Sequence, residues 1–197
     1  FLPGFARDAG GVRSFSADSA SRLTGIDLRV ESNAEPLIVW IDPERTALVP
    51  GGEDIRYGLT SLMDIRPILG VVDRNAEPLG YLYSGTSGLA RKKHTGWTSV
   101  FTSAPNIPPK VLGALFESAG VHRYMQSGDV VYANSSLIAV SASSRGTKQL
   151  KMPGDESLTD VLTGEEFLAG KNGCIDLFMK RHEVRLFWRD SGGNNGK

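Results

Sequence analysis

The sequence predicts an α+β fold with many short strands, few helices and two successive domains. Short runs of β-branched and aromatic residues, separated by Gly, Pro, Asn and Asp, occur between residues 26 and 101 and again after residue 128. Between these regions, apolar residues recur at helical spacing over 108–119. A chain of 197 residues is long enough to bury one large core or two small ones.

The first part of the chain is expected to open with a loop over residues 1–16, which are rich in Gly, Ser and Ala. Asp18 is suited to cap a short helix over 19–24, with Gly25 in the left-handed position that ends it. The strand-like runs cover residues 26–30, 37–41, 65–72, 79–83 and 97–101. Because the connections between them are short, mostly antiparallel pairing is expected.

The region after residue 106 contains the strongest helix signal. Pro108 and Pro109 are tolerable only in a first turn, and the apolar spacing continues to Ala119, after which Gly120 ends the helix. The apolar stripe must be buried against a sheet, so residues 121–125 are expected to form the strand that follows.

The second domain is expected to be β-rich and sandwich-like, over residues 128–190. Its predicted strands cover residues 130–133, 137–142, 147–152, 158–162, 174–179 and 183–188. The first domain then covers residues 1–127, and residues 191–197, rich in Ser, Gly and Asn, should form a disordered tail.

The composition disfavours several classes of partner. Lys plus Arg number 22 and Asp plus Glu number 22, so the formal net charge is zero and no long-range field favours nucleic acid or an anionic membrane surface. The apolar runs are far shorter than the roughly 20 residues that cross a bilayer. The only cysteine, Cys174, begins a strand-like run and is expected to be a small buried apolar group.

The sequence predicts no catalytic residue, metal site or cofactor. The adjacent carboxylates Glu165 and Glu166 lie in a turn and are expected to be solvated. His94, His122 and His182 are scattered and lack the i, i+4 spacing of a zinc motif. No glycine-rich motif has the strand-to-helix context of a phosphate site.

Three residues are candidates for ligand binding. Trp97 has polar neighbours, and pyranose faces pack on such rings, although a Trp half-buried against the sheet is the alternative. His122 follows the main helix, where a hydrogen bond to backbone is the alternative. Asp129 precedes a strand, where turn formation is the alternative. The basic run at residues 91–94 is expected to be a solvated edge strand.

Several segments, in this order, resemble the C-terminal part of bacterial β-galactosidase-like glycoside hydrolases. The resemblance extends from about residue 1 to about residue 189. The segments are residues 23–28 (LTGIDL), 78–81 (PLGY), 96–101 (GWTSVF), 107–112 (IPPKVL), 119–124 (AGVHRY), 128–134 (GDVVYAN) and 162–165 (LTGE).

This resemblance implies a partial trimerisation-type domain with a glutamine-amidotransferase-like (flavodoxin-like) sheet, followed by the β-rich domain. It also implies an upstream catalytic barrel in the same polypeptide, which would hold the two carboxyl groups that glycoside hydrolysis needs. The chain opens at Phe1 without an initiator Met, which is expected of part of a longer protein. Completing the fold and promoting homo-oligomerisation are then its expected roles.

Two other functions stay open at this point. A stand-alone, non-catalytic carbohydrate-binding module would use its strand-rich fold and surface aromatic residues to bind sugar. A structural interaction domain would instead present an apolar patch to a partner.

Overall fold

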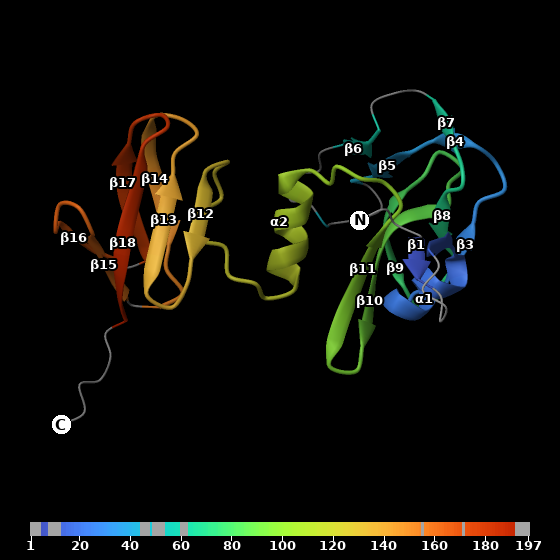
Figure 1. Ribbon diagram of the computed structural model, residues 1–197, viewed down its shortest axis with the longest axis horizontal. Coiled ribbons are helices and arrows are strands. Elements are labelled where there is room, and N and C mark those ends of the chain that lie inside the picture. The colour runs from blue at the N-terminus through green and yellow to red at the C-terminus, as the bar shows by residue number, and fades with distance from the viewer. Residues whose placement is uncertain are drawn as a thin grey trace. The chain divides into compact units, whose positions relative to one another are not determined.

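The computed structural model describes residues 5–7, 13–43, 48, 54–59, 63–154, 156–170 and 172–191. The chain divides into two compact units, Phe1–Ala119 and Gly120–Lys197, and the described residues are β-rich with two α-helices (Figure 1). No helix in this part is long and apolar enough to cross a membrane. An α+β class dominated by strands is therefore confirmed.

The start of the first unit differs from the expected loop over residues 1–16. Strand β1 (Phe5–Arg7) pairs antiparallel with β2 (Arg13–Phe15). Helix α1 (Ala17–Thr24) follows, and its N-cap is Ser16, whose hydroxyl accepts a hydrogen bond from the Ser19 amide. Asp18 was expected to be the cap, but it lies in the first turn, where a carboxylate complements the helix dipole.

The first unit contains a seven-stranded sheet in the order β3-β8-β10-β9-β5-β6, with β11 paired to β10. All of its strand pairs are antiparallel, as the short connections predicted. A separate two-stranded ribbon joins β4 (Glu35–Pro36) to β7 (Asp64–Ile65). The strands of the large sheet are β3 (Leu28–Val30), β5 (Ile38–Ile41), β6 (Ile55–Gly58), β8 (Leu69–Val71), β9 (Glu77–Tyr81), β10 (Ser87–His94) and β11 (Trp97–Thr102).

Strand pairing bears on two expectations for the first unit. A flavodoxin-like sheet is mostly parallel, so the amidotransferase-like architecture is not confirmed. The basic run at residues 91–94 was expected on an edge strand. Arg91 is paired with both β9 and β11, whereas residues 92–94 are paired with β11 alone, so the expectation fails only at Arg91. Glu77 and Asp73 neutralise Arg91 and Lys92.

Each helix of the first unit belongs to a different apolar cluster. Helix α2 (Pro109–Ser118), confirmed close to its predicted bounds, packs Val111 and Leu115 with Leu89 of β10. Helix α1 packs Ala20 with Ala90, the next residue of the same strand. Because neighbouring strand residues point to opposite faces, α1 and α2 cover opposite faces of the sheet.

The second unit contains two sheets that enclose one core. The core residues come from both sheets and include Ile138, Leu150, Leu158, Leu177 and Phe187. The five-stranded sheet has the order β12 (Val130–Ala133), β13 (Leu137–Ser141), β18 (Val184–Ser191), β15 (Glu156–Asp160) and β16 (Glu166–Leu168). The two-stranded sheet joins β14 (Gly146–Lys151) and β17 (Cys174–Met179).

The boundary between the units lies after Ala119, ahead of the predicted position at 127. Residues 121–125 were expected to form a strand and do not. The Tyr124 carbonyl instead accepts a hydrogen bond from the Lys151 amide, and Met125 packs into the second core. These residues therefore belong to the second unit. Residues 192–197 of the predicted tail lie outside the described residues.

Gly25 ends α1 with a φ of 68°, as its position in the sequence predicted. A Cβ there would lie 2.5 Å from His94 Cε1. We expect Gly25→Ala to destabilise the unit by more than the roughly 1–2 kcal/mol of left-handed strain alone. Gly96→Ala is the control, because Gly96 has a φ of 84° and open space around its Cβ position. Equal losses of thermal stability in the two variants would show that the His94 side chain moves away from the new Cβ without an energetic cost.

Candidate functional site

One outer face of the second unit is apolar. Tyr132, Ala139 and Leu186 are direct neighbours across β12, β13 and β18, so they share a face of the five-stranded sheet. Two further rows share the same face: Val130, Ser141 and Val184, and then Leu137 and Trp188. We call the following residues the apolar face: Val130, Tyr132, Leu137, Ala139, Val184, Leu186 and Trp188.

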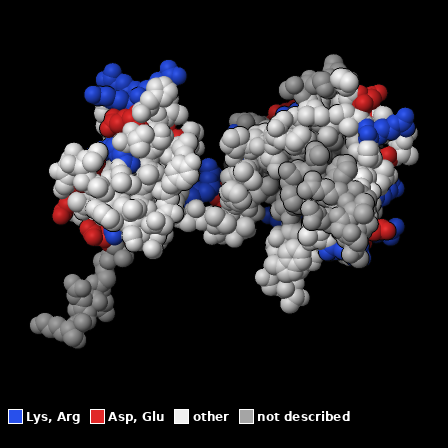
Figure 2. Space-filling model, in the orientation of Figure 1, with Lys and Arg blue, Asp and Glu red and all other residues white. Residues whose placement is uncertain are grey.

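The apolar face is exposed to an unusual extent for such residues. Tyr132 is 74% exposed and Trp188 is 49% exposed. Within the rows that define the face, Ser141 is the polar exception. In Figure 2, the surface over β12, β13 and β18 is mostly white, with charged groups gathered toward its margins. Contiguous apolar surface of this kind marks an interaction site in soluble proteins.

The opposite outer face of the same unit has the composition expected for contact with water. On β14 and β17 the outward positions include Thr147, Gln149, Lys151 and Asp176. Phe178 is the large apolar exception, and the Arg145 guanidinium lies 5.7 Å from the centre of its ring. An antiparallel sheet normally carries polar residues on its solvated face. The apolar face is therefore a specific property of one sheet of this unit.

A pocket of about 370 Å³ lies in the first unit, on the sheet formed by β6, β5 and β9. Its floor is a row of direct cross-strand neighbours, Arg56, Trp40 and Tyr81. Tyr83, in the turn after β9, is largely exposed and adds a further aromatic ring. The described residues that line the pocket are Ile38, Trp40, Arg56, Tyr81, Leu82, Tyr83 and Gly85.

A buried carboxylate holds the turn that carries Tyr83. Glu35 accepts hydrogen bonds from both the amide of Ser84, at 2.7 Å, and its hydroxyl, at 2.9 Å. Within the turn, the Gly85 amide donates to the Leu82 carbonyl at 3.0 Å. The turn is thus fixed to β4, a strand outside the large sheet.

The charges at this pocket are balanced. The Arg56 guanidinium lies 5.6 Å from the centre of the Trp40 ring and forms an ion pair with Asp54 at 3.3 Å. The indole N–H of Trp40 is buried and has no hydrogen-bond acceptor among the described residues. Any exposed surface of the indole ring is therefore carbon, which suits contact with an apolar surface of a ligand.

The sequence reasoning missed this pocket. The sequence does contain a signal for the pocket. Tyr81 and Tyr83 are two residues apart, as are Ile38 and Trp40, and residues two apart on a strand share a face. The two pairs come together because β5 lies between β6 and β9, and this strand order cannot be predicted from the two-residue period of a strand.

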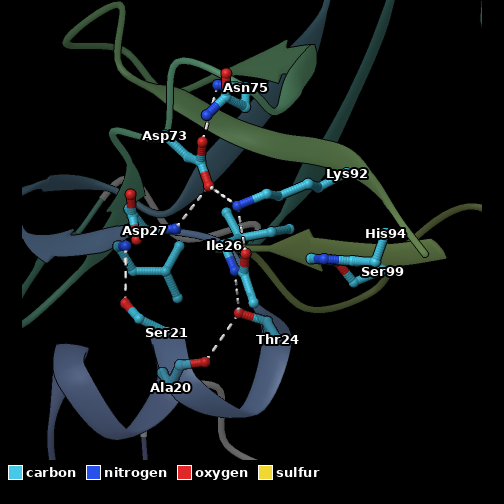
Figure 3. A network of polar contacts seen from close by, with 12 residues as sticks. Ala20, Ser21, Thr24, Ile26, Asp27, Asp73, Asn75, Lys92, His94 and Ser99 are labelled. Atoms are coloured by element: carbon cyan, nitrogen blue, oxygen red, sulfur yellow. Dashed lines mark hydrogen bonds and ion pairs between the residues drawn. The ribbon is translucent and has the colours of Figure 1, made fainter. Parts of the chain in front are cut away.

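Trp97, a predicted ligand-binding residue, begins β11 at the turn of the β10–β11 hairpin. Its ring stacks on His94, with 4.0 Å between ring centroids and 12° between ring planes. The His94 Nε2 and the Ser99 hydroxyl are 3.0 Å apart, and Figure 3 shows both side chains on the hairpin. Trp97 is half exposed, so its ring edge is available while one face is covered by His94. Ligand binding at Trp97 stays a prediction.

His122 and Asp129, the other two predicted residues, lie in the second unit and have internal partners. His122 Nε2 donates to the Lys151 carbonyl at 2.9 Å, and the ring makes an edge contact with Tyr124. Asp129 accepts hydrogen bonds from Ser127 and from both the amide and the hydroxyl of Ser143. These contacts match the structural alternatives for both residues, and their role in ligand binding stays a prediction.

Asp129 also forms a buried ion pair. Lys148 Nζ lies 3.0 Å from its carboxylate, and the side chains are 6% (Lys148) and 0% (Asp129) exposed. Burial raises the pKa of Asp129, but hydrogen bonds from Ser127, Ser143 and Lys148 outweigh burial and hold the pKa below its ordinary value. Asp129 is therefore ionised in the folded unit at neutral pH.

Asp73 is a comparable centre in the first unit (Figure 3). Its carboxylate accepts from Lys92 Nζ at 2.6 Å, from the Asn75 amide at 2.8 Å and from the Asp27 amide at 3.1 Å. Lys92 also donates to the Gly25 carbonyl at 2.6 Å, which connects the end of α1 to β10. Burial raises the pKa of Asp73, and these donors bring it below its ordinary value.

The remaining expectations from the sequence concern metal ligands, Cys174 and Glu165. Among the described residues, no group of three or more His, Cys, Asp or Glu side chains is placed to hold a metal. Cys174 is partly buried, less so than expected, and its thiol lies 3.8 Å from the Asn172 carbonyl oxygen. Glu165 is 59% exposed, as expected for a solvated carboxylate, and it also lies 3.2 Å from the Arg185 guanidinium.

Comparison with known proteins gives a likeness of fold. No protein-family model matches the sequence, and no curated protein is significantly similar to it. The structure is similar to a β-galactosidase from Bacillus circulans sp. alkalophilus, with a TM-score of 0.57, 14% identity and 87% of this chain covered. It is also similar to Gan42B, a GH42 β-galactosidase from G. stearothermophilus, with a TM-score of 0.50, 10% identity and 90% coverage.

This chain corresponds to only a part of these enzymes. It covers 26% of the Bacillus circulans enzyme and 25% of Gan42B. At these identities the likeness concerns the fold alone. The described residues therefore have the fold of about a quarter of a GH42-type β-galactosidase chain.

Proposed function

We propose that this chain is a non-catalytic accessory portion of a β-galactosidase-like glycoside hydrolase, with a role in homo-oligomer assembly. The observation that carries the proposal is the fold likeness, which includes 87% of this chain but 26% of the Bacillus circulans β-galactosidase. The remaining length of such an enzyme is where a catalytic barrel, with its pair of carboxyl groups, would lie. The trimerisation-type assignment of the first unit belongs to the same proposal.

The apolar face supports assembly. It is uncharged within its defining rows, so two copies can pair without like-charge repulsion. The chain as a whole carries no formal net charge, which also removes long-range repulsion between copies. Apolar cores with aromatic residues are typical of homodimer and obligate interfaces. We therefore assign a second copy of the chain as the occupant of this face.

The test is the molar mass of the chain in solution. Light scattering after size-exclusion chromatography is expected to give a multiple of the chain mass. Tyr132→Lys places a charge on the apolar face, and we expect it to weaken self-association at least about tenfold. Tyr132 is exposed in the unit, so the variant should remain folded by circular dichroism.

Phe178→Lys is the matched control, because Phe178 is 58% exposed on the opposite outer face. It should leave the molar mass unchanged. A parent chain that stays monomeric at about 100 µM, or equal dissociation by both variants, would count against assembly through the apolar face. The non-catalytic part of the proposal has a separate test, because the chain should not hydrolyse 4-nitrophenyl β-D-galactopyranoside by itself.

A second candidate function, a carbohydrate-binding module, is favoured by the aromatic pocket of the first unit. Pockets that combine aromatic walls with a few polar groups are typical of small-ligand sites. This candidate is compatible with an accessory role, since a binding module can belong to a larger hydrolase. It predicts sugar binding whatever the oligomeric state.

A further inference from the structure

We infer that the pocket formed by Trp40, Arg56, Tyr81 and Tyr83 in the first unit binds a neutral pyranose ring of a carbohydrate. None of these residues is on the apolar face, and none was predicted as a site residue from the sequence. The inference rests on the carbohydrate-binding candidate above, for which it names the site and the ligand class, and it is independent of the oligomeric state.

The aromatic rings suit a sugar because a pyranose has an apolar face of C–H groups and a rim of hydroxyls. Trp40 and Tyr81 are direct neighbours across β5 and β9, so their side chains extend from the same face of the sheet. Tyr83 adds an exposed ring at the mouth of the pocket. A volume of about 370 Å³ is within the range of small-ligand pockets and can hold one pyranose ring with part of a second.

The polar groups favour a neutral ligand. Arg56 supplies hydrogen-bond donors at the floor of the pocket, and its ion-pair partner Asp54, 3.3 Å away, is a carboxylate next to the lining residues. A donor and an acceptor side by side match vicinal hydroxyls, each of which both donates and accepts. Because the carboxylate neutralises the guanidinium, the pair gives a phosphate or carboxylate ligand little net attraction.

The pocket is also organised before a ligand binds. Its floor consists of residues on three paired strands, β6, β5 and β9. Its rim is held by the two hydrogen bonds from Ser84 to the buried Glu35 carboxylate. A preformed site loses less conformational entropy on binding, which matters for a weakly bound ligand such as a sugar.

The experiment uses Trp40 as its reporter. The chain has three tryptophans, so Trp97→Phe combined with Trp188→Phe leaves Trp40 as the only one. Both replaced residues are about half exposed, and neither lines the pocket. This reporter chain is titrated with methyl β-D-galactopyranoside, methyl β-D-glucopyranoside, lactose and galactose 6-phosphate. A saturable change in Trp40 emission, with a Kd in the range of about 0.1–10 mM, is expected for neutral sugars.

Variants separate a site from non-specific effects. Tyr83→Ala in the reporter chain should weaken binding about tenfold, because it removes a stacking ring without touching the core. Tyr83→Phe keeps the ring and should lose less than Tyr83→Ala. Arg56→Met keeps the side-chain stem near Trp40 and removes the donors, so binding should again weaken severalfold. Phe178→Ala, on the opposite outer face of the second unit, should leave sugar binding unchanged.

Three results would overturn the inference. The first is the absence of saturable binding of every neutral sugar to the unmodified chain, as measured by calorimetry. The second is binding that is unchanged in both Tyr83→Ala and Arg56→Met. The third is binding of galactose 6-phosphate alone, which would indicate an anion site. Because molar mass is measured separately, failure here is distinguishable from failure of the assembly proposal.

Discussion

Lys148→Met is expected to lower the free energy of unfolding of the second unit by about 3–5 kcal/mol. The change keeps a long, unbranched side chain on β14 but removes the ammonium that lies 3.0 Å from the Asp129 carboxylate. The carboxylate is fully buried, so without Lys148 it has hydrogen bonds but no counter-charge. Urea unfolding followed by circular dichroism measures the loss, and hydrogen exchange of β14 and β17 amides assigns it to this unit.

Lys151→Met is the matched control on the same strand. Lys151 is exposed, and its hydrogen bonds with His122 and Tyr124 are made by backbone atoms, so its replacement should change stability by no more than about 0.5 kcal/mol. The double variant Asp129→Asn with Lys148→Met removes both charges. The double variant should lose less free energy of unfolding than the sum of the losses in the two single variants, because it leaves no buried charge unpaired. Strict additivity would mean that the two side chains do not interact.

The pH dependence of this pair follows from the lowered pKa of Asp129. An unfolded aspartate has a pKa of about 3.9, so the stabilisation is fully present above that value and is lost as the pH falls. Lys148→Met removes one of the donors that lower the pKa of Asp129, so the folded state of the variant stabilises the ionised carboxylate less than the parent does. The difference in stability between the parent and Lys148→Met should therefore be largest near neutral pH and shrink toward pH 3. Melting temperatures at a series of pH values test this directly, and a constant difference would contradict it.

The helices and most strands could be predicted from the sequence because their signals are local. Pro108 and Pro109 fixed the start of α2, and Gly25 fixed the end of α1 through its left-handed backbone. The N-cap was wrong by two residues because Ser16 and Asp18 are both good caps. The choice between such residues depends on the preceding backbone, which is extended at Ser16.

Features that depend on pairing between distant strands could not be predicted. The pocket requires Trp40 to lie between Arg56 and Tyr81, and this adjacency comes from the order of β6, β5 and β9. The buried pair of Asp129 and Lys148 was missed for a similar reason, because a single lysine on an alternating strand is normally a solvated group. The resemblance to β-galactosidase-like glycoside hydrolases predicted two domains, the second of them β-rich, but it did not predict the antiparallel pairing of the first unit.

The apolar face has a signal in the sequence of β18 that the sequence reasoning missed. Val184, Leu186 and Trp188 alternate with Arg185, Phe187 and Arg189, so residue types alone would assign the apolar row to the core. In the structure the opposite face holds the core residue Phe187, and Arg185 and Arg189 form ion pairs with Asp160 and Glu156. The sequence therefore marks this row as apolar, but the strand pairing is needed to show that it is exposed.

Asp73→Ala is expected to lower the free energy of unfolding of the first unit by about 3–5 kcal/mol. The side chain of Asp73 is 1% exposed, and its loss leaves the Lys92 ammonium without its counter-charge. It also leaves the amides of Asp27 and Asn75 without their acceptor. Because Lys92 connects β10 to the Gly25 carbonyl, the end of α1 should become less protected against hydrogen exchange.

The neighbouring ion pair is the control for this prediction. Arg91, next to Lys92 on β10, pairs with Glu77 at 2.7 Å, and the Glu77 side chain is 53% exposed. Glu77→Ala should therefore cost at most about 1 kcal/mol, since solvent screens the exposed pair and hydrates the remaining charge. Two adjacent ion pairs on one strand would then differ in effect because one carboxylate is buried and the other is not. Equal losses in urea unfolding for Asp73→Ala and Glu77→Ala would contradict this account of how the first unit holds α1 to its sheet.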